Sequence, residues 1–320
     1  MFLMMSFSGL LMLVSDMRGL LRFIRRFLGT SQLEVKLSMI DEKIDLLREL
    51  SLPSSGVVEV GALVDSSMGE VRRFVSRSYI RGSGIEIGAF TSPLDVPSDV
   101  RVSYVDKYDL DAIDSAHSVA GLSLADFGVC VSSIIRPDII DDGETLSKIG
   151  DLSQDFVIAN HVLEHFEDPI KGFKNMLRVV KHGGVVYLAL PDMRRSFDRV
   201  RSETSFEHIL RDYVEGPSTS RGEAYAEFAD IFVSHGMDKG LFDKRHGEER
   251  RQFIVSQAQA LEAAGFSIHF HAWTLDGMQD MFLKMKRMFG LNFDTKLVLQ
   301  NGDEVIFVFE KNTDRPGVSG

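Results

Sequence analysis

From about residue 82 onward, short apolar runs alternate with longer segments of mixed polarity. The runs that predict strands lie at residues 85–87, 102–105, 138–140, 156–159, 185–190, 267–272 and 305–309. The last two should complete an antiparallel edge, with a hairpin turn at Asn301-Gly302. Strands that alternate with helices form a parallel sheet with helices on both faces. The pattern predicts an α/β fold with a doubly wound, seven-stranded and mostly parallel sheet.

Residues 1–52 follow a different pattern and predict a helical arm ahead of a domain at 53–315. The apolar run at 1–14 is shorter than the roughly 18–20 residues that cross a bilayer, so no transmembrane helix is expected. No basic residue precedes the run and no clear small-residue cleavage site follows it, so no signal peptide is expected either. Residues 17–28 place apolar positions opposite arginines at helical spacing. We expect residues 10–28 either to lie on an anionic membrane surface or to pack against their own domain or a second copy.

Residues 33–50 carry apolar side chains in alternating steps of four and three, which is the seam of a short coiled coil. This helix is expected to support a homo-oligomer. The serine-, proline- and glycine-rich stretch at 51–56 reads as a linker, so a boundary is placed at residue 52.

The net charge of the chain limits the kinds of partner that are expected. Lysine and arginine total 36 and aspartate and glutamate 47, a net charge of −11 over 320 residues. Such a chain repels a phosphate backbone, so nucleic acid is not expected as a partner. The one cysteine, Cys130, excludes an internal disulfide and is typical of a reducing compartment. The expected location is the cytoplasm, with the arm available for the inner membrane surface.

Candidate chemistry gathers at the ends of the first two predicted strands. Gly88 follows the first strand in a tight turn, and Asp106 ends the second, about where nucleotide sites hold a ribose diol. Phe90 and Ser92 stand where a dinucleotide fingerprint would need further glycines for a pyrophosphate. An acidic Glu86 beneath the turn suits a cationic ligand better than an anionic one. These features favour a sulfonium cofactor over a nicotinamide dinucleotide.

These motifs, with three that follow them, resemble the class I S-adenosylmethionine-dependent methyltransferases. Glu86-Ile87-Gly88 is similar to the first motif and Asp106 to the ribose-binding acid, while residues 141–146, 155–165 and 178–184 are similar to the motifs around the third, fourth and fifth strands. The resemblance implies a Rossmann-like methyltransferase fold with S-adenosylmethionine as cofactor. The candidate cofactor-binding residues are Glu86, Gly88, Ala89, Phe90, Asp106, Asp142, Gly143 and Asn160.

A narrower resemblance covers residues 190–213 and 269–274, which are similar to bacterial methyltransferases associated with surface-polysaccharide and glycan biosynthesis. It implies a glycan or small-molecule acceptor. Residues 192–256 form an insertion too long for an ordinary connection, and we expect it to act as a helical substrate lid. Within it, Thr204, His208 and Asp212 recur every four residues and would share one helix face. The candidate substrate-binding residues are Arg194, Arg195, Arg201 and His271.

Methyl transfer to a hydroxyl is an in-line displacement that benefits from a general base, and imidazole is well poised for that role near neutral pH. The candidate bases are His161, His165 and His208, each of which could instead be a hydrogen-bonded packing residue. His161, Glu164 and His165 lack a further ligand at a convincing spacing, so no metal is expected. Two other functions stay open, a nicotinamide-dependent oxidoreductase and a non-catalytic cofactor-binding scaffold at a membrane assembly.

Overall fold

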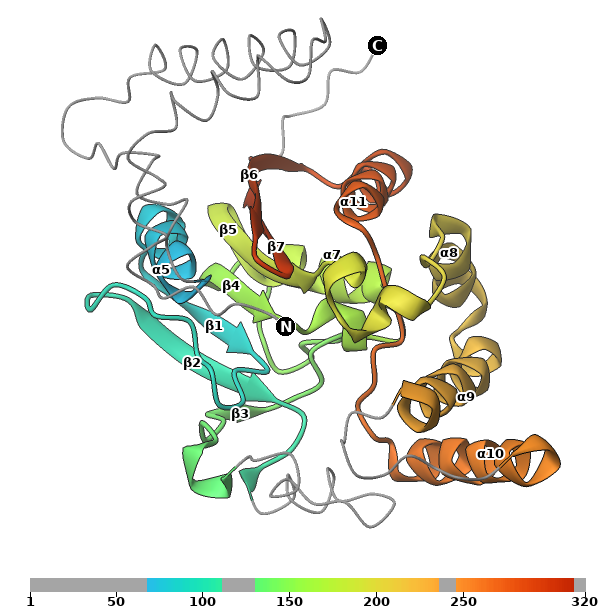
Figure 1. Cartoon of the computed structure of the whole chain (residues 1–320). Coiled ribbons are helices and arrows are strands. Elements are labelled where there is room, and N and C mark those ends of the chain that lie inside the picture. Colours follow the sequence, from blue (N-terminus) through green and yellow to red (C-terminus); the bar gives the residue numbers. More distant parts are fainter. Residues whose placement is uncertain (1–67, 111–129, 236–245, 314–320) are drawn as a thin grey trace, which may run out of the picture. The chain divides into compact units, whose positions relative to one another are not determined.

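The computed structural model describes residues 68–110, 130–235 and 246–313, which all belong to one compact unit, Ser66–Gly320 (Figure 1). The predicted arm at 1–52 and its linker lie outside these residues, so membrane contact and oligomer formation stay predictions. Among the described residues, no helix is both long and apolar enough to cross a membrane.

One sheet of seven strands runs in the order β3-β2-β1-β4-β5-β7-β6. The strands are β1 (Ser83–Ile87), β2 (Arg101–Asp106), β3 (Ile139–Ile140), β4 (Gln154–Asn160), β5 (Val180–Pro191), β6 (Phe293–Asn301) and β7 (Glu304–Lys311). β1 to β5 pair in parallel, and the β6–β7 hairpin adds an antiparallel edge to β5. The strand order reverses between β1 and β4, the switch point where such sheets bind ligands. The predicted fold class is confirmed.

The predicted strand at 267–272 is wrong, and β6, which no prediction covered, lies beside β7 instead. In the segment at 267–272, the carbonyls of His269 and Phe270 accept hydrogen bonds from the Arg201 side chain rather than from a neighbouring strand. β6 lacks a clear apolar run because three positions near its start are exposed. The predicted hairpin turn is present, with Gly302 at a φ of 63°.

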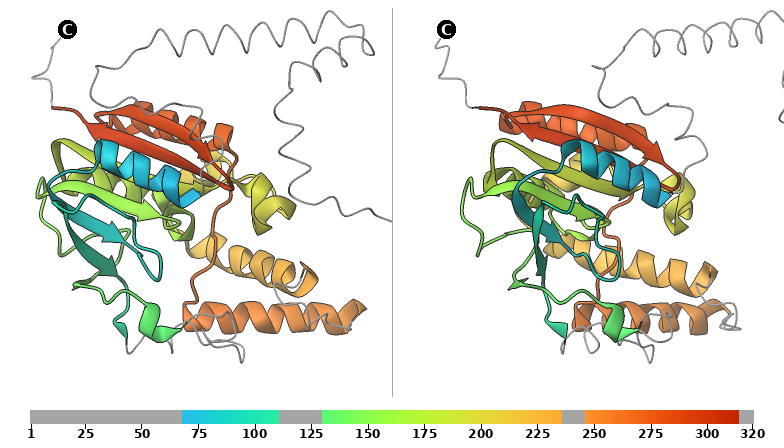
Figure 2. Two further views of the ribbon diagram at one scale, coloured as in Figure 1. Left: turned by 60° about the vertical axis from the view of Figure 1, so that its left-hand side comes forward. Right: turned by 90° about the vertical axis from the view of Figure 1, so that its left-hand side faces the viewer.

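Helices cover both faces of the sheet. The longer helices are α5 (Met68–Tyr79), α7 (Pro169–Val179), α8 (Phe206–Glu215), α9 (Ser218–His235), α10 (Gly247–Ala264) and α11 (Leu275–Phe289), and the short 3₁₀ turns are Val131–Ser133, Leu163–His165, Met193–Arg195 and Phe197–Val200. α5 lies on one face, and α7 and α11 lie on the other (Figures 1 and 2).

The main core lies between the sheet and α7 and α11. Along β7, Val305, Phe307 and Phe309 point into this core, and the residues between them point toward the face that carries α5. The ring of Phe173 on α7 lies 4.9 Å from that of Phe282 and 5.3 Å from that of Phe309, measured between centroids. These buried rings fix the edge hairpin against the helices, since each contributes roughly 1.5–3 kcal/mol through burial.

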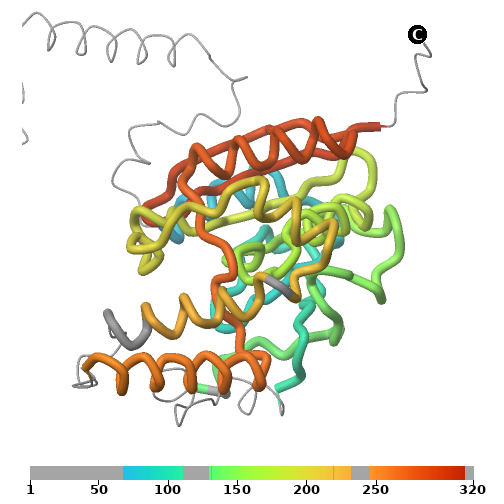
Figure 3. Tube along the Cα trace, turned by 90° about the vertical axis from the view of Figure 1, so that its right-hand side faces the viewer, coloured from blue at the N-terminus to red at the C-terminus, as the bar shows by residue number. Residues whose placement is uncertain are grey.

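The insertion after β5 folds as helices, as predicted, and α9 and α10 run side by side within it (Figure 3). Tyr225 and Ala229 of α9 pack against Ala258 and Leu261 of α10 in a small apolar cluster. α10 continues past the predicted end of the insertion at residue 256 and stops at Gly265, whose φ of 60° is the left-handed conformation that ends helices. The lid role stays a prediction.

The helix expected around residues 204–212 is shorter than its pattern suggested. Ser205 caps α8 by accepting a hydrogen bond from the backbone N–H of His208, so Thr204 lies outside the helix. Thr204 Oγ1 instead accepts a hydrogen bond from the backbone N–H of Ala272 at 3.0 Å. His208 and Asp212 do share a face, with Nε2 and Oδ2 3.2 Å apart.

Candidate active site

A cavity of about 1090 Å³ opens at the carboxyl ends of β1, β2 and β4. Its far side is formed by the start of α9 and by residues that follow α10, so the insertion contributes to it. The volume exceeds the roughly 300–1,000 Å³ of typical small-molecule sites. All eight candidate cofactor-binding residues line it, namely Glu86, Gly88, Ala89, Phe90, Asp106, Asp142, Gly143 and Asn160. Residues far apart in sequence therefore meet at one sheet edge.

The turn after β1 depends on Gly88. Its φ of 62° is a conformation that favours glycine, and an added Cβ would approach Val162 Cγ2 at 3.1 Å. Its backbone N–H donates to Val105 O at 2.9 Å, which ties the turn to β2. Phe90 also has a left-handed φ, 47°, without being glycine. The phenylalanine therefore adopts, at some cost in strain, a backbone shape that glycine adopts freely.

Glu86 and Asn160 form the polar floor beneath this turn. Glu86 is 1% exposed, and its two carboxylate oxygens accept from the backbone N–H of Leu94 at 3.0 and 3.2 Å. Burial raises the pKa of Glu86 to about 7, against a weaker lowering by these hydrogen bonds. Asn160 donates to Glu86 at 3.4 Å, while its buried Oδ1 has no hydrogen-bond partner among the described residues. Asn160 therefore lines the cavity with an unused acceptor oxygen buried beneath its surface.

Two further carboxylates line the cavity, one at the end of β2 and one in the loop after β3. Asp106 Oδ1 accepts from the backbone N–H of Tyr108 at 3.4 Å, and Asp142 Oδ1 accepts from that of Glu144 at 2.8 Å. Gly143 next to Asp142 is tightly enclosed, because a Cβ there would come within 2.9 Å of Ile87 and 3.0 Å of Phe166. The loop after β3 therefore comes close to the end of β1 only with a glycine at this position.

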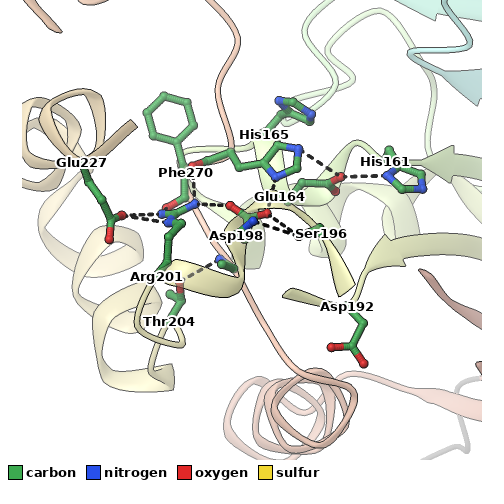
Figure 4. Close-up of polar contacts among 12 residues, drawn as sticks. His161, Glu164, His165, Asp192, Ser196, Asp198, Arg201, Thr204, Glu227 and Phe270 are labelled. Atoms are coloured by element: carbon green, nitrogen blue, oxygen red, sulfur yellow. Dashed lines mark hydrogen bonds and ion pairs between the residues drawn. The ribbon is translucent and has the colours of Figure 1, made fainter. Parts of the chain in front are cut away.

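His161 lies where β4 ends and the cavity begins. Its φ of 53° is an outlier for a non-glycine residue. Its Nε2 lies 3.0 Å from Oε2 of Glu304. Its Nδ1 lies 3.6 Å from Oε1 of Glu164, a contact drawn in Figure 4. Burial opposes the protonated form, but the hydrogen bond with Glu304 and the charges of both carboxylates outweigh it and raise the pKa of His161. Backbone strain of this kind is common at functional sites.

Glu304 begins β7 and is held by three side chains. Arg72 of α5 donates to both of its oxygens, and Asn301 Nδ2 donates to Oε1 at 2.6 Å. Burial would raise the pKa of Glu304, but the hydrogen bonds from Arg72 and His161 lower it to about 2. Arg72 also lines the cavity. Sequence reasoning missed Arg72 and Glu304, and the only local signal was a lone carboxylate at the start of an apolar run.

His165 lines the same cavity one helical turn further on. Its Nδ1 lies 3.0 Å from Ser267 Oγ, and its ring packs edge to face on that of His269, with centroids 4.6 Å apart. Burial lowers the pKa of His165 to about 3, so its imidazole is neutral at physiological pH. Glu164, between the two histidines in sequence, is completely buried.

The structure does not bring the remaining candidate base and two of the candidate arginines to the cavity. His208 pairs with Asp212 and is not among the lining residues. Arg194 pairs with Asp192 at 2.5 Å, and Arg195 donates to the carbonyl of Gly302 at 3.0 Å. Each of these side chains is engaged by its own segment or by the edge hairpin, and their expected roles stay predictions.

Arg201 and His271 also lie outside the lining. The Arg201 side chain is 6% exposed and pairs with Asp198 at 3.0 Å and Glu227 at 2.7 Å (Figure 4). His271 is 1% exposed and stacks on Trp273, with ring centroids 5.3 Å apart. Arg201 holds the segment after α10 through the carbonyls of His269 and Phe270, and direct substrate binding by Arg201 or His271 stays a prediction.

One segment of the chain is similar in sequence to a known protein family, and most of the chain is similar in structure to solved proteins. Residues 133–188, from just before β3 into β5, match a family model described as a methyltransferase domain. A protein from Pyrococcus horikoshii is similar over 73% of this chain and 85% of its own, at 15% identity and a TM-score of 0.37. A SAM-dependent methyltransferase from Thermotoga maritima is similar over 77% and 92%, at 14% identity and a TM-score of 0.35. No curated protein is similar enough to count as a relative.

The matched residues include β3, β4, α7 and most of β5. Asn160, His161 and His165 lie within them. The match therefore confirms the enzyme class predicted from the motifs: the chain carries a methyltransferase domain.

Proposed function

We propose that this enzyme transfers a methyl group to a hydroxyl of a small-molecule or glycan acceptor bound in the cavity. The observation that carries the proposal is the His161–Glu304 pair, a carboxylate-held imidazole at the edge of the candidate cofactor site. A hydroxyl is a poor nucleophile until a base takes its proton, so a positioned imidazole suits this acceptor.

Residues around the β1 turn would hold the cofactor. The unpartnered Oδ1 of Asn160 can accept from its ammonium group, and the carboxylate of Asp106 can accept from both hydroxyls of its ribose. Asp142 and Gly143 would border the adenine. When bound, the cofactor supplies a methyl group made electrophilic by a sulfonium. These residues fit a cationic ligand, because the turn has acceptor oxygens and a buried carboxyl group, Glu86. It lacks the several glycines that a pyrophosphate-binding turn needs.

In this proposal His161 receives the proton of the acceptor hydroxyl. Glu304 orients the ring through Nε2 and stabilises the imidazolium that forms, as carboxylates do for catalytic histidines. Arg72 keeps Glu304 ionised, so the carboxylate is available at every physiological pH. The remaining rate enhancement comes from holding the reactants in line within the enclosed cavity.

A glycan or other ring-shaped acceptor is favoured by the outer part of the cavity. Tyr213, Tyr225, Phe266 and Phe270 line this side, and the rings of Tyr225 and Phe270 meet edge to face at 5.6 Å. Aromatic faces combine apolar contact with polar tips and suit the mixed surface of a sugar. The narrower sequence resemblance to glycan-modifying methyltransferases points the same way.

The arm would bring this site to its substrate. Residues 10–28 would lie on the inner membrane surface of the cytoplasm through their apolar face and arginines, and residues 33–50 would pair with a second copy. Both segments lie outside the described residues. A cytoplasmic enzyme held this way would meet lipid-linked acceptors.

The test is to incubate the protein with methyl-labelled S-adenosylmethionine and a fractionated lysate. Label should enter a glycan or small-molecule fraction as a base-stable ether, and His161→Ala should abolish the transfer while calorimetry still detects cofactor binding. Label in protein or nucleic acid would refute the acceptor class. Cofactor binding with no transfer to any fraction would favour a scaffold, and binding of NADPH in its place would favour an oxidoreductase.

A further inference from the structure

We propose that Glu164, His165 and His269 bind a divalent first-row transition metal ion at the base of the cavity. Each residue offers one ligand atom, and these atoms all lie within 4.8 Å of one another. His269 stands more than 100 positions beyond the other two, so no spacing in the sequence connects it with them. The structure supplies the further ligand whose apparent absence argued against a metal.

The spacing is close to that of a coordination sphere. Nε2 of His269 lies 3.9 Å from Oε1 of Glu164, and the His269 and His165 rings are in edge-to-face contact. Metal–ligand bonds of about 2.0–2.2 Å hold the ligand atoms of a tetrahedral ion roughly 3.5 Å apart. Side-chain adjustments of less than about 1.5 Å would therefore close the site around an ion.

The Glu164 carboxylate independently indicates a missing partner. It is fully buried, and neither of its oxygens has a hydrogen-bond partner in the part of the chain that the structure describes. A buried carboxyl without any hydrogen bond is costly and rare. Imidazole nitrogens lie near it on two sides, and Nδ1 of His161 is 3.6 Å from Oε1 (Figure 4). A cation bound between these groups would satisfy the carboxylate.

The surroundings also resemble the outer shell of a metal site. Asp198 Oδ2 lies 2.7 Å from Nδ1 of His269, which orients the ring and leaves Nε2 toward Glu164. Asp198 is itself fixed by Arg201 at 3.0 Å and by Ser196 at 3.1 Å (Figure 4). Carboxylate–histidine–metal arrangements of this kind fix the tautomer of the ligand and strengthen it. Arg201, expected to bind substrate, thus acts on the candidate metal site through Asp198, which holds His269.

The ligand set selects the kind of metal. Two imidazoles and one carboxylate suit Zn²⁺, Co²⁺, Fe²⁺ or Mn²⁺, whereas Mg²⁺ prefers oxygen ligands alone. Three protein ligands leave a coordination position open, which is typical of catalytic rather than structural sites. His165 lines the cavity, so this position would face the acceptor. A role in lowering the pKa of an acceptor hydroxyl follows, and that consequence alone rests on the proposed function.

The test uses untagged full-length protein stripped with a chelator and titrated with Co²⁺. One equivalent should produce the visible absorption of protein-bound Co²⁺, excess Zn²⁺ should remove it, and Mg²⁺ should not. Glu164→Gln and His269→Ala should weaken Co²⁺ binding by more than the roughly 10–100-fold expected for Asp198→Asn, which removes only an outer-shell partner. His246→Ala, which changes an exposed histidine ahead of α10, should bind Co²⁺ as the wild type does.

Calorimetry with S-adenosylmethionine on every variant shows that the fold and the cofactor site are intact. A wild-type protein that binds the cofactor but gives no Co²⁺ absorption would overturn the metal site and leave the proposed function standing. Unchanged Co²⁺ affinity in Glu164→Gln and His269→Ala would overturn it as well. Co²⁺ binding without methyl transfer to any hydroxyl acceptor would count against the proposed function only.

Discussion

Oε2 of Glu304 lies 3.0 Å from Nε2 of His161, although 143 positions separate the two residues along the chain. The pairing arises because Glu304 is the first residue of β7, directly after the hairpin turn, and His161 follows the last residue of β4. The antiparallel edge of the sheet therefore does more than complete the fold. It carries an ionised carboxylate, held by Arg72, to the edge of the cavity.

Glu304→Gln should lower kcat by roughly 100-fold or more, since the imidazole loses the anion that orients it and stabilises its protonated form. Affinity for S-adenosylmethionine should change little, because Glu304 is not among the residues that line the cavity. Steady-state kinetics with the acceptor fraction and calorimetry with the cofactor separate the two effects. Glu310→Gln is the matched control, since Glu310 forms only a 3.5 Å surface pair with Lys296. Equal losses of kcat in both variants would contradict the pairing role.

Asp106→Ala should weaken S-adenosylmethionine binding about 10–100-fold, because hydrogen bonds to a charged group contribute roughly 1.5–3 kcal/mol. Calorimetry measures this directly, without any acceptor. Asp99→Ala removes an exposed carboxylate ahead of β2 and should leave the affinity unchanged. If Asp106→Ala bound the cofactor as tightly as the wild type, the assignment to the ribose hydroxyls would be wrong.

Gly88→Ala and Gly183→Ala separate backbone strain from cofactor binding. Both glycines have a left-handed φ, 62° and 76°, so each substitution should cost about 1–2 kcal/mol in urea unfolding. Only Gly88 lines the cavity, and only there would the new Cβ meet a neighbour, Val162, at 3.1 Å. Cofactor affinity should therefore fall in Gly88→Ala alone. A parallel fall in Gly183→Ala would mean that loss of stability, not the turn, weakens binding.

Replacing the arginines of the arm tests the membrane proposal. Arg18, Arg22, Arg25 and Arg26 changed to glutamine should release the protein from anionic vesicles, since each basic residue near such a surface contributes about 1 kcal/mol. Vesicle sedimentation measures the bound fraction, and cofactor affinity serves as the control for an intact enzyme domain. An unchanged bound fraction would argue that residues 10–28 pack against protein instead.

The sheet was predictable to the extent that its strands are buried. β4 and β5 read as apolar runs because both of their faces are covered, whereas β6 has exposed positions along an edge and gave no such run. The segment at 267–272 has an apolar pattern as good as that of several true strands. It is not one, because its carbonyls bond to Arg201, and that contact could not be predicted from local sequence.

The candidate cofactor site was predictable for a related reason. Gly88 and Asp106 end neighbouring parallel strands, so their places in the sequence already put them at one sheet edge. His269 and Glu304 reach His165 and His161 only through tertiary folding, and no spacing rule connects them. For Arg201, local sequence did not reveal the contacts that hold it. An arginine in a polar insertion reads as a ligand for a charged substrate, yet it is buried among carboxylates and carbonyls.

Glu86 should make stability depend on pH in a direction opposite to that of most carboxylates. Burial raises its pKa in the folded state from the ordinary 4.5 to about 7. The folded state then keeps a proton that the unfolded state has lost, so the free energy of unfolding falls as the pH rises from about 4.5 to about 7. At 1.36 kcal/mol for each pKa unit, the effect is at most on the order of 3 kcal/mol.

Glu86→Gln should remove this contribution, because the amide cannot ionise and its oxygen can still accept from the N–H of Leu94. Relative to the wild type, the variant should gain stability between pH 4.5 and 7 and keep that gain above pH 7. Urea unfolding at a series of pH values, without cofactor, measures the difference. Glu215→Gln, at the exposed end of α8, should run parallel to the wild type throughout. If Glu86→Gln also ran parallel, Glu86 would be ionised in the folded protein, and the cofactor would meet a full negative charge beneath its turn.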